Sequence, residues 1–158
     1  MILGIPLGVA LGTTRSWEQT WQPAIESMYA VPKTMLYPIF ILLFGVGIGS
    51  RISIAFSHAL LPIVSSAMTS AAARSSSIVT ALAPAVRASL SLAFIGVVLS
   101  EMYASTQGLG LLLMLSARER DGVNRVLAII LLLFLLLLLV NISFRALEKR
   151  LQTNAEPK

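Results

Sequence analysis

Few residues in this sequence are of types that could carry out chemistry. His58 is the single histidine, no cysteine is present, and Glu101 interrupts apolar sequence with no second carboxylate beside it. The lack of cysteine excludes disulfides, thiolate nucleophiles and zinc–thiolate sites. Neither a Ser-His-Asp set, nor a histidine cluster for a metal, nor a phosphate-binding loop can be recognised. The sequence therefore argues against an enzyme and predicts no catalytic residue, metal site or cofactor.

His58 lies well inside an apolar segment that runs from Ile52 to Met68. An ionisable side chain within a membrane segment is a functional candidate by default. However, a lone histidine with no carboxylate nearby in the sequence is more typical of a neutral residue hydrogen-bonded between helices. We therefore interpret His58 as structural.

The elements that must position these residues are organised around the segment from Val126 to Val140, which contains no polar side chain. Burying each such side chain gains about 1.5–3 kcal/mol, and this run leaves no hydrophilic face for water. A chain of 158 residues cannot build a core large enough to surround it. Extended through Phe144, the segment approaches the roughly 20 residues that cross a bilayer. We predict a transmembrane helix here.

Composition supports the same interpretation. Hydrophobic residues make up 56% of the chain and charged residues 12%, about half the usual globular share. The net charge of +5 does not indicate nucleic acid, because the basic residues are scattered singly between apolar runs, as topology determinants are. We predict an all-α fold, a polytopic transmembrane helix bundle, in one domain covering residues 1–158. Its expected parts are a partial first helix 1–12, an interfacial helix 16–30, spans 34–49, 52–68, 79–100 and 126–144, and a cytoplasmic tail 145–158.

The expected interfacial helix is amphipathic, with Trp17 and Trp21 on its apolar face. Paired tryptophans suit the headgroup boundary of a membrane, so we expect this helix to lie along one membrane surface, with a partner helix as the alternative. Ser16 followed by Gln19 fits a capping box. Pro23 predicts either a kink or the start of a second short helix.

Two sets of small residues indicate close helix packing. Gly45 and Gly49 form a G-x-x-x-G or, together with Gly47, a flexible exit from a helix. The span 79–100 carries a second set at intervals of four, consisting of Ala81, Ala85, Ser89 and Ala93. Such a stripe lets another backbone approach, which predicts a central place for this helix.

Residues 69–77 are small and polar, and predict a loop or short helix outside the lipid. After Glu101, the Gly108-Leu109-Gly110 break separates an apolar piece that is too short to cross, so we expect a re-entrant or interfacial segment. The distribution of Lys and Arg places the C-terminus in the cytoplasm and the segment at Gly108–Gly110 on the outward side.

Several motifs carry a resemblance to a known family. They are L-G-I-P-L-G-V-A-L-G, Y-P-I-F-I-L-L-F-G-V-G, A-L-L-P-I-V and A-F-I-G-V-V-L-S-E-M-Y-A-S-T-Q-G-L-G. The chain resembles the permease subunit of bacterial ABC importers of the nitrate/sulfonate/taurine type, a branch that includes importers of thiamine-precursor pyrimidines. The resemblance runs from about Leu3 to Arg150, and its most specific part is the motif from Glu101 to Gly110.

The resemblance implies a multi-pass protein of the bacterial inner membrane that imports a small organic solute or anion. Its implied partners are a second permease copy, a cytoplasmic ABC ATPase dimer, an extracytoplasmic solute-binding protein and the lipid bilayer, with no nucleic acid. The same resemblance implies that the chain lacks a helix before Leu3 and is truncated at its start.

The chain departs from this family at the cytoplasmic coupling loop. The family has an E-A-A motif followed by glycine on a short helix that docks into the ATPase. Here the corresponding residues are Ala72, Ala73 and Arg74, with Ala71 in place of the glutamate, no glycine, and a shorter loop. The alternative interpretation is therefore a non-transporting remnant or an interaction subunit. A self-contained channel is a third possibility, disfavoured by the shortage of polar pore-lining residues.

Overall fold

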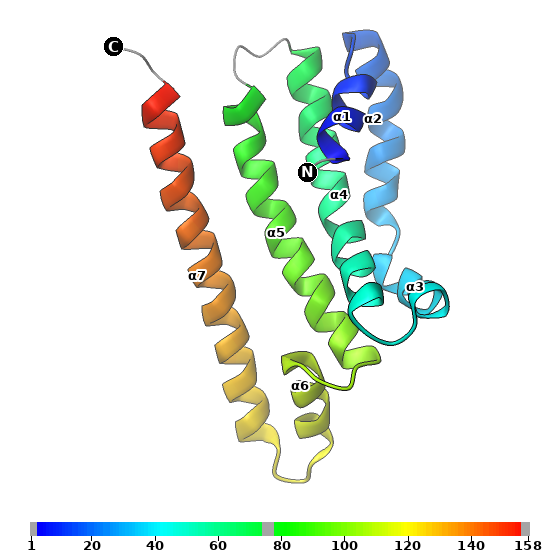
Figure 1. Ribbon diagram of the computed structural model, residues 1–158, viewed down its shortest axis with the longest axis vertical. Coiled ribbons are helices and arrows are strands. Elements are labelled where there is room, and N and C mark those ends of the chain that lie inside the picture. The colour runs from blue at the N-terminus through cyan, green and yellow to red at the C-terminus, as the bar shows by residue number, and fades with distance from the viewer. Residues whose placement is uncertain (1–2, 74–77, 156–158) are drawn as a thin grey trace. The chain divides into compact units, whose positions relative to one another are not determined.

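The computed structural model describes residues 3–73 and 78–155, and in those ranges it contains helices and no strand (Figure 1). Within these ranges, the side chains are described except at residues 78–81 and 150–155. This confirms the all-α fold class. The elements are α1 (Gly4–Leu11), α2 (Arg15–Ala30), the 3-10 helix η1 (Lys33–Leu36), α3 (Tyr37–Phe44), α4 (Ile48–Ala72), α5 (Ile78–Tyr103), α6 (Leu109–Arg118) and α7 (Val123–Ala155).

Within the described ranges, three helices are long and apolar enough to cross a membrane. They are α4, α5 over Leu82–Tyr103, and α7 over Val123–Lys149. The most apolar stretch of α7 has a mean hydropathy of 3.1 and no buried residue. A helix that is apolar all round and unburied needs an apolar solvent, so the prediction that α7 lies in lipid agrees with the structure.

The predicted span 34–49 is wrong as a single helix. Its residues are divided among η1, the eight-residue α3 and the start of α4. Gly45 ends α3 with a φ of +72°, a backbone conformation that favours glycine over other residues. Gly45 consequently ends α3 while Gly49 lies in α4, so the two do not form a G-x-x-x-G on one helix. A fourth span arises only if α2 and the segment Lys33–Phe44 are taken together.

The bounds of α4 correct two further expectations. Arg51, which falls between the predicted spans 34–49 and 52–68, lies in the first turn of α4. Residues 69–72, expected in a loop or a separate short helix, form the last turn of α4. There the Thr69 and Ser70 hydroxyls donate hydrogen bonds to carbonyls of the preceding turn. Such bonds satisfy the hydroxyls inside the helix, which allows polar residues to extend it.

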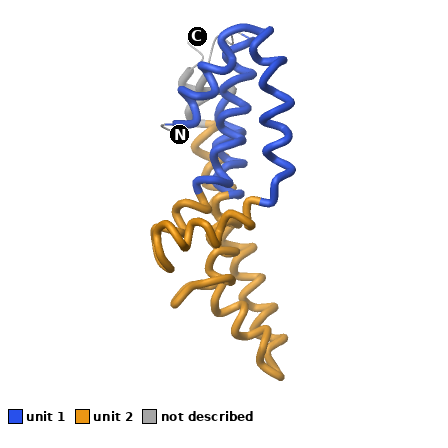
Figure 2. Tube along the Cα trace, turned by 90° about the vertical axis from the view of Figure 1, so that its right-hand side faces the viewer, with its two compact units in different colours: residues 1–32, 56–92 blue, residues 33–55, 93–158 orange. Residues whose placement is uncertain are grey.

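The chain forms two compact units, residues 1–32 with 56–92 and residues 33–55 with 93–158 (Figure 2). In the first unit, α1 lies against α4 through three glycines at intervals of four. A Cβ on Gly8 would lie 2.5 Å from the Val64 carbonyl oxygen, and one on Gly12 would lie 2.1 Å from that of Met68. A Cβ on Gly4 would lie 2.8 Å from the Ile63 side chain. The missing side chains thus allow backbone-to-backbone packing.

In the same unit, α2 lies alongside α4, with Ile25 buried in a cluster with Val64 and Met68. The helix is continuous through Pro23, so no second helix begins there. The predicted Ser16–Gln19 capping box is wrong. Thr14 is the N-cap, because its backbone is extended and its hydroxyl accepts the Trp17 N–H at 3.3 Å, which leaves Ser16 inside the first turn.

In the second unit, α6 packs against α7 as a helical hairpin. The connecting turn depends on Gly122, where a Cβ would lie 1.7 Å from the Ser116 carbonyl oxygen. An exposed ion pair joins Arg125 Nη1 to Glu119 Oε2 at 2.5 Å across this turn. The hairpin fixes the N-terminus of α6, which faces the end of α5.

Candidate functional site

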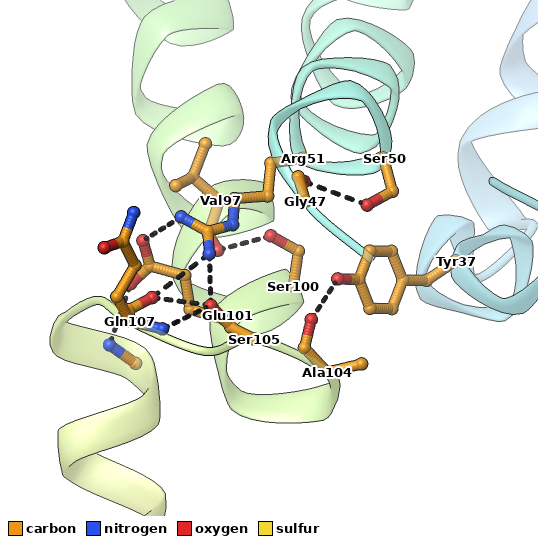
Figure 3. Close-up of polar contacts among 11 residues, drawn as sticks. Tyr37, Gly47, Ser50, Arg51, Val97, Ser100, Glu101, Ala104, Ser105 and Gln107 are labelled. Carbon is orange, nitrogen blue, oxygen red and sulfur yellow. Dashed lines mark hydrogen bonds and ion pairs between the residues drawn. The ribbon is translucent and has the colours of Figure 1, made fainter. Parts of the chain in front are cut away.

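Glu101, in the last turn of α5, is the centre of a polar network in the second unit (Figure 3). Its Oε2 accepts a hydrogen bond from the Gly110 N–H at 3.0 Å. Gly110 lies in the first turn of α6, where backbone N–H groups have no partner within the helix. The carboxylate therefore caps α6, and its negative charge is favoured by the positive end of the helix dipole.

Arg51, in the first turn of α4, supplies the cation of this network. Its Nη1 lies 3.5 Å from Glu101 Oε1, and the two side chains are only 15% and 13% exposed. Its Nη2 also donates to the Gln107 carbonyl oxygen at 3.2 Å and to Ser105 Oγ. Arg51 Nε is buried without a hydrogen-bond partner among the described residues. One guanidinium thus links α4 both to the end of α5 and to the turn before α6.

The turn between α5 and α6 is shaped by Ser105, Gln107 and Gly108. Ser105 Oγ donates to the Gln107 carbonyl oxygen at 2.5 Å and accepts the Gln107 N–H at 3.2 Å. Gly108 has a φ of +126°, and a Cβ there would lie 2.1 Å from the Glu101 carboxyl carbon. Only glycine fits both the backbone conformation and the carboxylate.

Gly110 is required for a different reason. A Cβ on Gly110 would lie 2.3 Å from the Val98 carbonyl oxygen, so α6 begins in backbone contact with α5. This proximity places the Gly110 N–H within hydrogen-bonding distance of Glu101. The predicted motif residues Glu101, Gly108 and Gly110 are therefore brought together as one capping structure.

Tyr37 joins α3 to the same turn. Its side chain is 2% exposed, and its hydroxyl donates to the Ala104 carbonyl oxygen at 2.9 Å. Figure 3 shows the Tyr37 hydroxyl pointing toward Ala104, just past the end of α5. The Tyr37 and Tyr103 rings lie 6.4 Å apart and tilted, a favourable aromatic arrangement. The network therefore fixes α3, α4, α5 and α6 at one place.

The chemistry of this site is structural. Each charge is matched by an opposite charge or by hydrogen bonds, and no group of three metal-ligating side chains occurs among the residues that the structure describes. A paired carboxylate and guanidinium with few exposed atoms can hold helices in register. Breaking this ion pair would release the helices together, because each buried charge depends on the other.

The other predicted site residues lie elsewhere. Ala72 ends α4, Ala73 follows it with an exposed side chain, and Arg74 lies outside the described residues. Along the predicted stripe of α5, Ser89 is 3% exposed while Ala85 and Ala93 are half-buried. The side chain of Ala81 is not described. The stripe thus faces protein at Ser89, whose hydroxyl has no hydrogen-bond partner within the described part of the chain.

Sequence reasoning missed Arg51, Tyr37 and the α1 glycines as positioning residues. A signal for Arg51 was present, because it and Glu101 are opposite charges at the ends of two long apolar segments. The glycines at 4, 8 and 12 carried a packing signal at helical spacing. Tyr37 had none, since its hydrogen bond reaches a backbone carbonyl 67 residues away.

Comparison with known proteins links this architecture to transport. Residues 77–153 match the family model of the binding-protein-dependent transport system inner membrane component. The matched segment contains α5, the Glu101–Gly110 motif, α6 and most of α7. No solved structure matches the chain.

Two curated relatives are similar over nearly the whole chain. The taurine transport system permease protein TauC of Escherichia coli (strain K12) is 26% identical, covering 96% of this chain and 63% of the relative. The putative aliphatic sulfonates transport permease protein SsuC of Bacillus subtilis (strain 168) is 27% identical, covering 94% of this chain and 62% of the relative. The chain thus spans less than two thirds of the length of these relatives.

Proposed function

We propose that the chain is a member of the family of binding-protein-dependent transport system inner membrane components, whose model matches residues 77–153, and that it is the membrane-spanning subunit of an ATP-driven importer. The proposed cargo is a small organic anion of the sulfonate or taurine class, with nitrate and thiamine precursors as related candidates. The observation that carries this proposal is the match over α5 to α7 together with three helices long enough to cross a bilayer.

The proposed assembly consists of two permease copies around one path, a cytoplasmic ATPase dimer and an extracytoplasmic binding protein. We place the C-terminus in the cytoplasm and the Glu101 network on the outward side, following the distribution of basic residues. In alternating access, the ATPases move the helices that surround the path. The Arg51–Glu101 network would then make the outward ends of α4, α5 and α6 move as one body.

The alternative is a non-transporting remnant or interaction subunit, and one observation favours it. Only residues 73–77 separate α4 from α5. These five residues amount to little more than one helical turn of about 3.6 residues, fewer than a docking helix of two turns requires. Ala72, Ala73 and Arg74 would then be the remains of an ATPase contact that transmits little movement.

Two measurements separate these functions. The tagged chain, co-expressed with the ATPase of a sulfonate importer, should co-purify with it in detergent. In proteoliposomes, a binding protein loaded with taurine or an alkanesulfonate should then raise ATP hydrolysis. Stable association without this stimulation would favour the interaction subunit, and failure to associate would overturn the importer proposal.

A substitution in the chain sharpens this comparison. Ala71→Glu restores the acid of the family's E-A-A pattern in the last turn of α4. Stronger ATPase association in this variant would locate the contact at the end of α4. Gln19→Glu, which adds the same charge at an exposed position on the amphipathic α2, is the matched control and should leave association unchanged.

A further inference from the structure

The guanidinium of Arg51 has one buried donor that the network does not use. Its Nη2 donates to Ser105 Oγ and to the Gln107 carbonyl oxygen. Its Nε is buried and has no hydrogen-bond partner among the residues that the structure describes. A buried N–H without an acceptor is unfavourable, because it has lost its water and gained nothing in exchange. An acceptor for this group lies close by.

The acceptor is the carboxylate of Glu101. Its Oε1 lies 3.5 Å from Arg51 Nη1, whereas a charge-assisted hydrogen bond between such groups is about 2.7–2.9 Å long. Carboxylates and guanidinium groups pair most strongly through two parallel N–H···O bonds, and Nε with Nη2 forms one edge of the guanidinium that can make them. The observed contact is therefore weaker than the pairing that Arg51 and Glu101 could form.

The turn between α5 and α6 remains hydrogen-bonded without Arg51. Ser105 Oγ donates to the Gln107 carbonyl oxygen at 2.5 Å and accepts the Gln107 N–H at 3.2 Å. Gln107 is exposed, as are its hydrogen bonds with Ser105 and Arg51, so water can replace the guanidinium there. The loss of exposed hydrogen bonds is thus offset by an acceptor for the buried Nε.

We propose that Arg51 is a two-position latch that holds or releases the turn between α5 and α6. In the held position, which the structure shows, Nη2 binds Ser105 and Gln107 (Figure 3). In the released position, Nε and Nη2 donate side by side to the Glu101 carboxylate. The two positions exclude each other because both use Nη2.

The latch frees the turn without separating the helices. Arg51 contacts Glu101 in both positions, so α4 stays joined to the end of α5. Each carboxylate oxygen has two lone pairs, so Oε2 can keep the Gly110 N–H that caps α6. Only the segment from Ser105 to Gln107 gains freedom to move. This device goes beyond the proposed transport function and does not depend on it.

The Nε–H group of Arg51 reports the position of the latch directly. The full chain is prepared with isotopically labelled arginine in lipid nanodiscs, and the Arg51 Nε signal is assigned by its loss in Arg51→Lys. A hydrogen bond to a carboxylate shifts the Nε proton downfield and slows its exchange with water. We expect relaxation dispersion and saturation-transfer NMR to show a principal state with unbonded Nε, in exchange with a minor downfield-shifted state.

Substitutions in the turn should change the populations of the two positions. Ser105→Ala removes one of the two acceptors of Nη2 and should raise the released population several-fold. Thr106→Ala, at an exposed position in the same turn, is the matched control and should leave the populations unchanged. Ser105→Thr retains the hydroxyl and should restore the original populations. A purely structural Ser105 would alter stability without moving the Arg51 Nε proton toward a carboxylate.

Three outcomes would overturn the latch. The first is a single Arg51 Nε signal without exchange, both in the original chain and in Ser105→Ala. The second is an unbonded signal with a cross peak to a long-lived water, which would assign a bound water to Nε. The third is exchange that survives in Glu101→Gln, which would exclude the carboxylate as the acceptor. If Ser105→Ala failed to fold, exchange in the original chain and its loss in Glu101→Gln would decide.

Discussion

Arg51 and Glu101, fifty residues apart in the chain, form an ion pair of 3.5 Å in which both side chains are largely buried. Glu101→Gln would keep an oxygen for the Gly110 N–H but leave the Arg51 guanidinium without its counter-charge. Breaking a buried pair in this way destabilises proteins by about 3–5 kcal/mol. We expect a loss near the lower limit, measured by unfolding in a denaturing detergent titration, because the pair retains some exposure.

An exposed ion pair in the same unit provides the control. Glu119→Gln breaks the contact with Arg125. In this pair the Arg125 side chain is 69% exposed and the Glu119 side chain 52% exposed. Exposed pairs contribute about 0–1 kcal/mol. Equal effects of the two substitutions would show that the Arg51–Glu101 pair has no special role. A double-mutant cycle with Arg51→Met isolates the pair energy.

Gly108→Ala should disrupt the cap of α6. The substitution adds a Cβ that would lie 2.1 Å from the Glu101 carboxyl carbon, at a φ of +126°. Strain from a positive φ alone costs about 1–2 kcal/mol for a residue with a side chain. We expect a larger total loss of stability and a lower yield of protein in membranes. Gly47→Ala, where a Cβ meets nothing within 4 Å, should have little effect.

Hydrophobic pattern predicted the fold class and the three long helices, because a bilayer imposes length and apolarity on each span independently of its neighbours. It failed at 34–49, where the residues are apolar throughout but Gly45 ends the helix. An apolar run indicates that a segment lies in an apolar solvent, whereas the continuity of a helix depends on the local backbone conformation. The bounds of α4 were missed for the opposite reason, since Thr69 and Ser70 are polar yet bond within the helix.

The site was predicted only in part. The motif from Glu101 to Gly110 is local, so its members could be recognised together in the sequence. Arg51 and Tyr37 reach this motif from 54 and 67 residues away, through contacts with Ser105 and Ala104. Such contacts depend on how the helices pack, which a single sequence does not specify.

The glycines of α1 yield a prediction opposite to helix propensity. Gly8→Ala should favour an isolated helix by up to about 1 kcal/mol. Here the added Cβ would lie 2.5 Å from the Val64 carbonyl oxygen and 2.6 Å from the Ala67 Cβ. We therefore expect Gly8→Ala to lower stability, measured by the detergent titration. Ala10→Leu, exposed on the other face of α1, should be neutral, and a stabilised Gly8→Ala would contradict the packing of α1 on α4.

The solvent around α7 can be tested with one charge. Leu135 is 50% exposed and lies in the middle of the apolar stretch. If α7 crosses a bilayer, Leu135→Arg should reduce insertion by about 2.5–3.5 kcal/mol in a translocon insertion assay with a glycosylation reporter. Leu147→Arg, 51% exposed near the end of the span, should have a much smaller effect because its side chain can reach the interface. If α7 instead lay in water, both substitutions would be tolerated and would improve solubility, and the importer assignment would lose its physical basis.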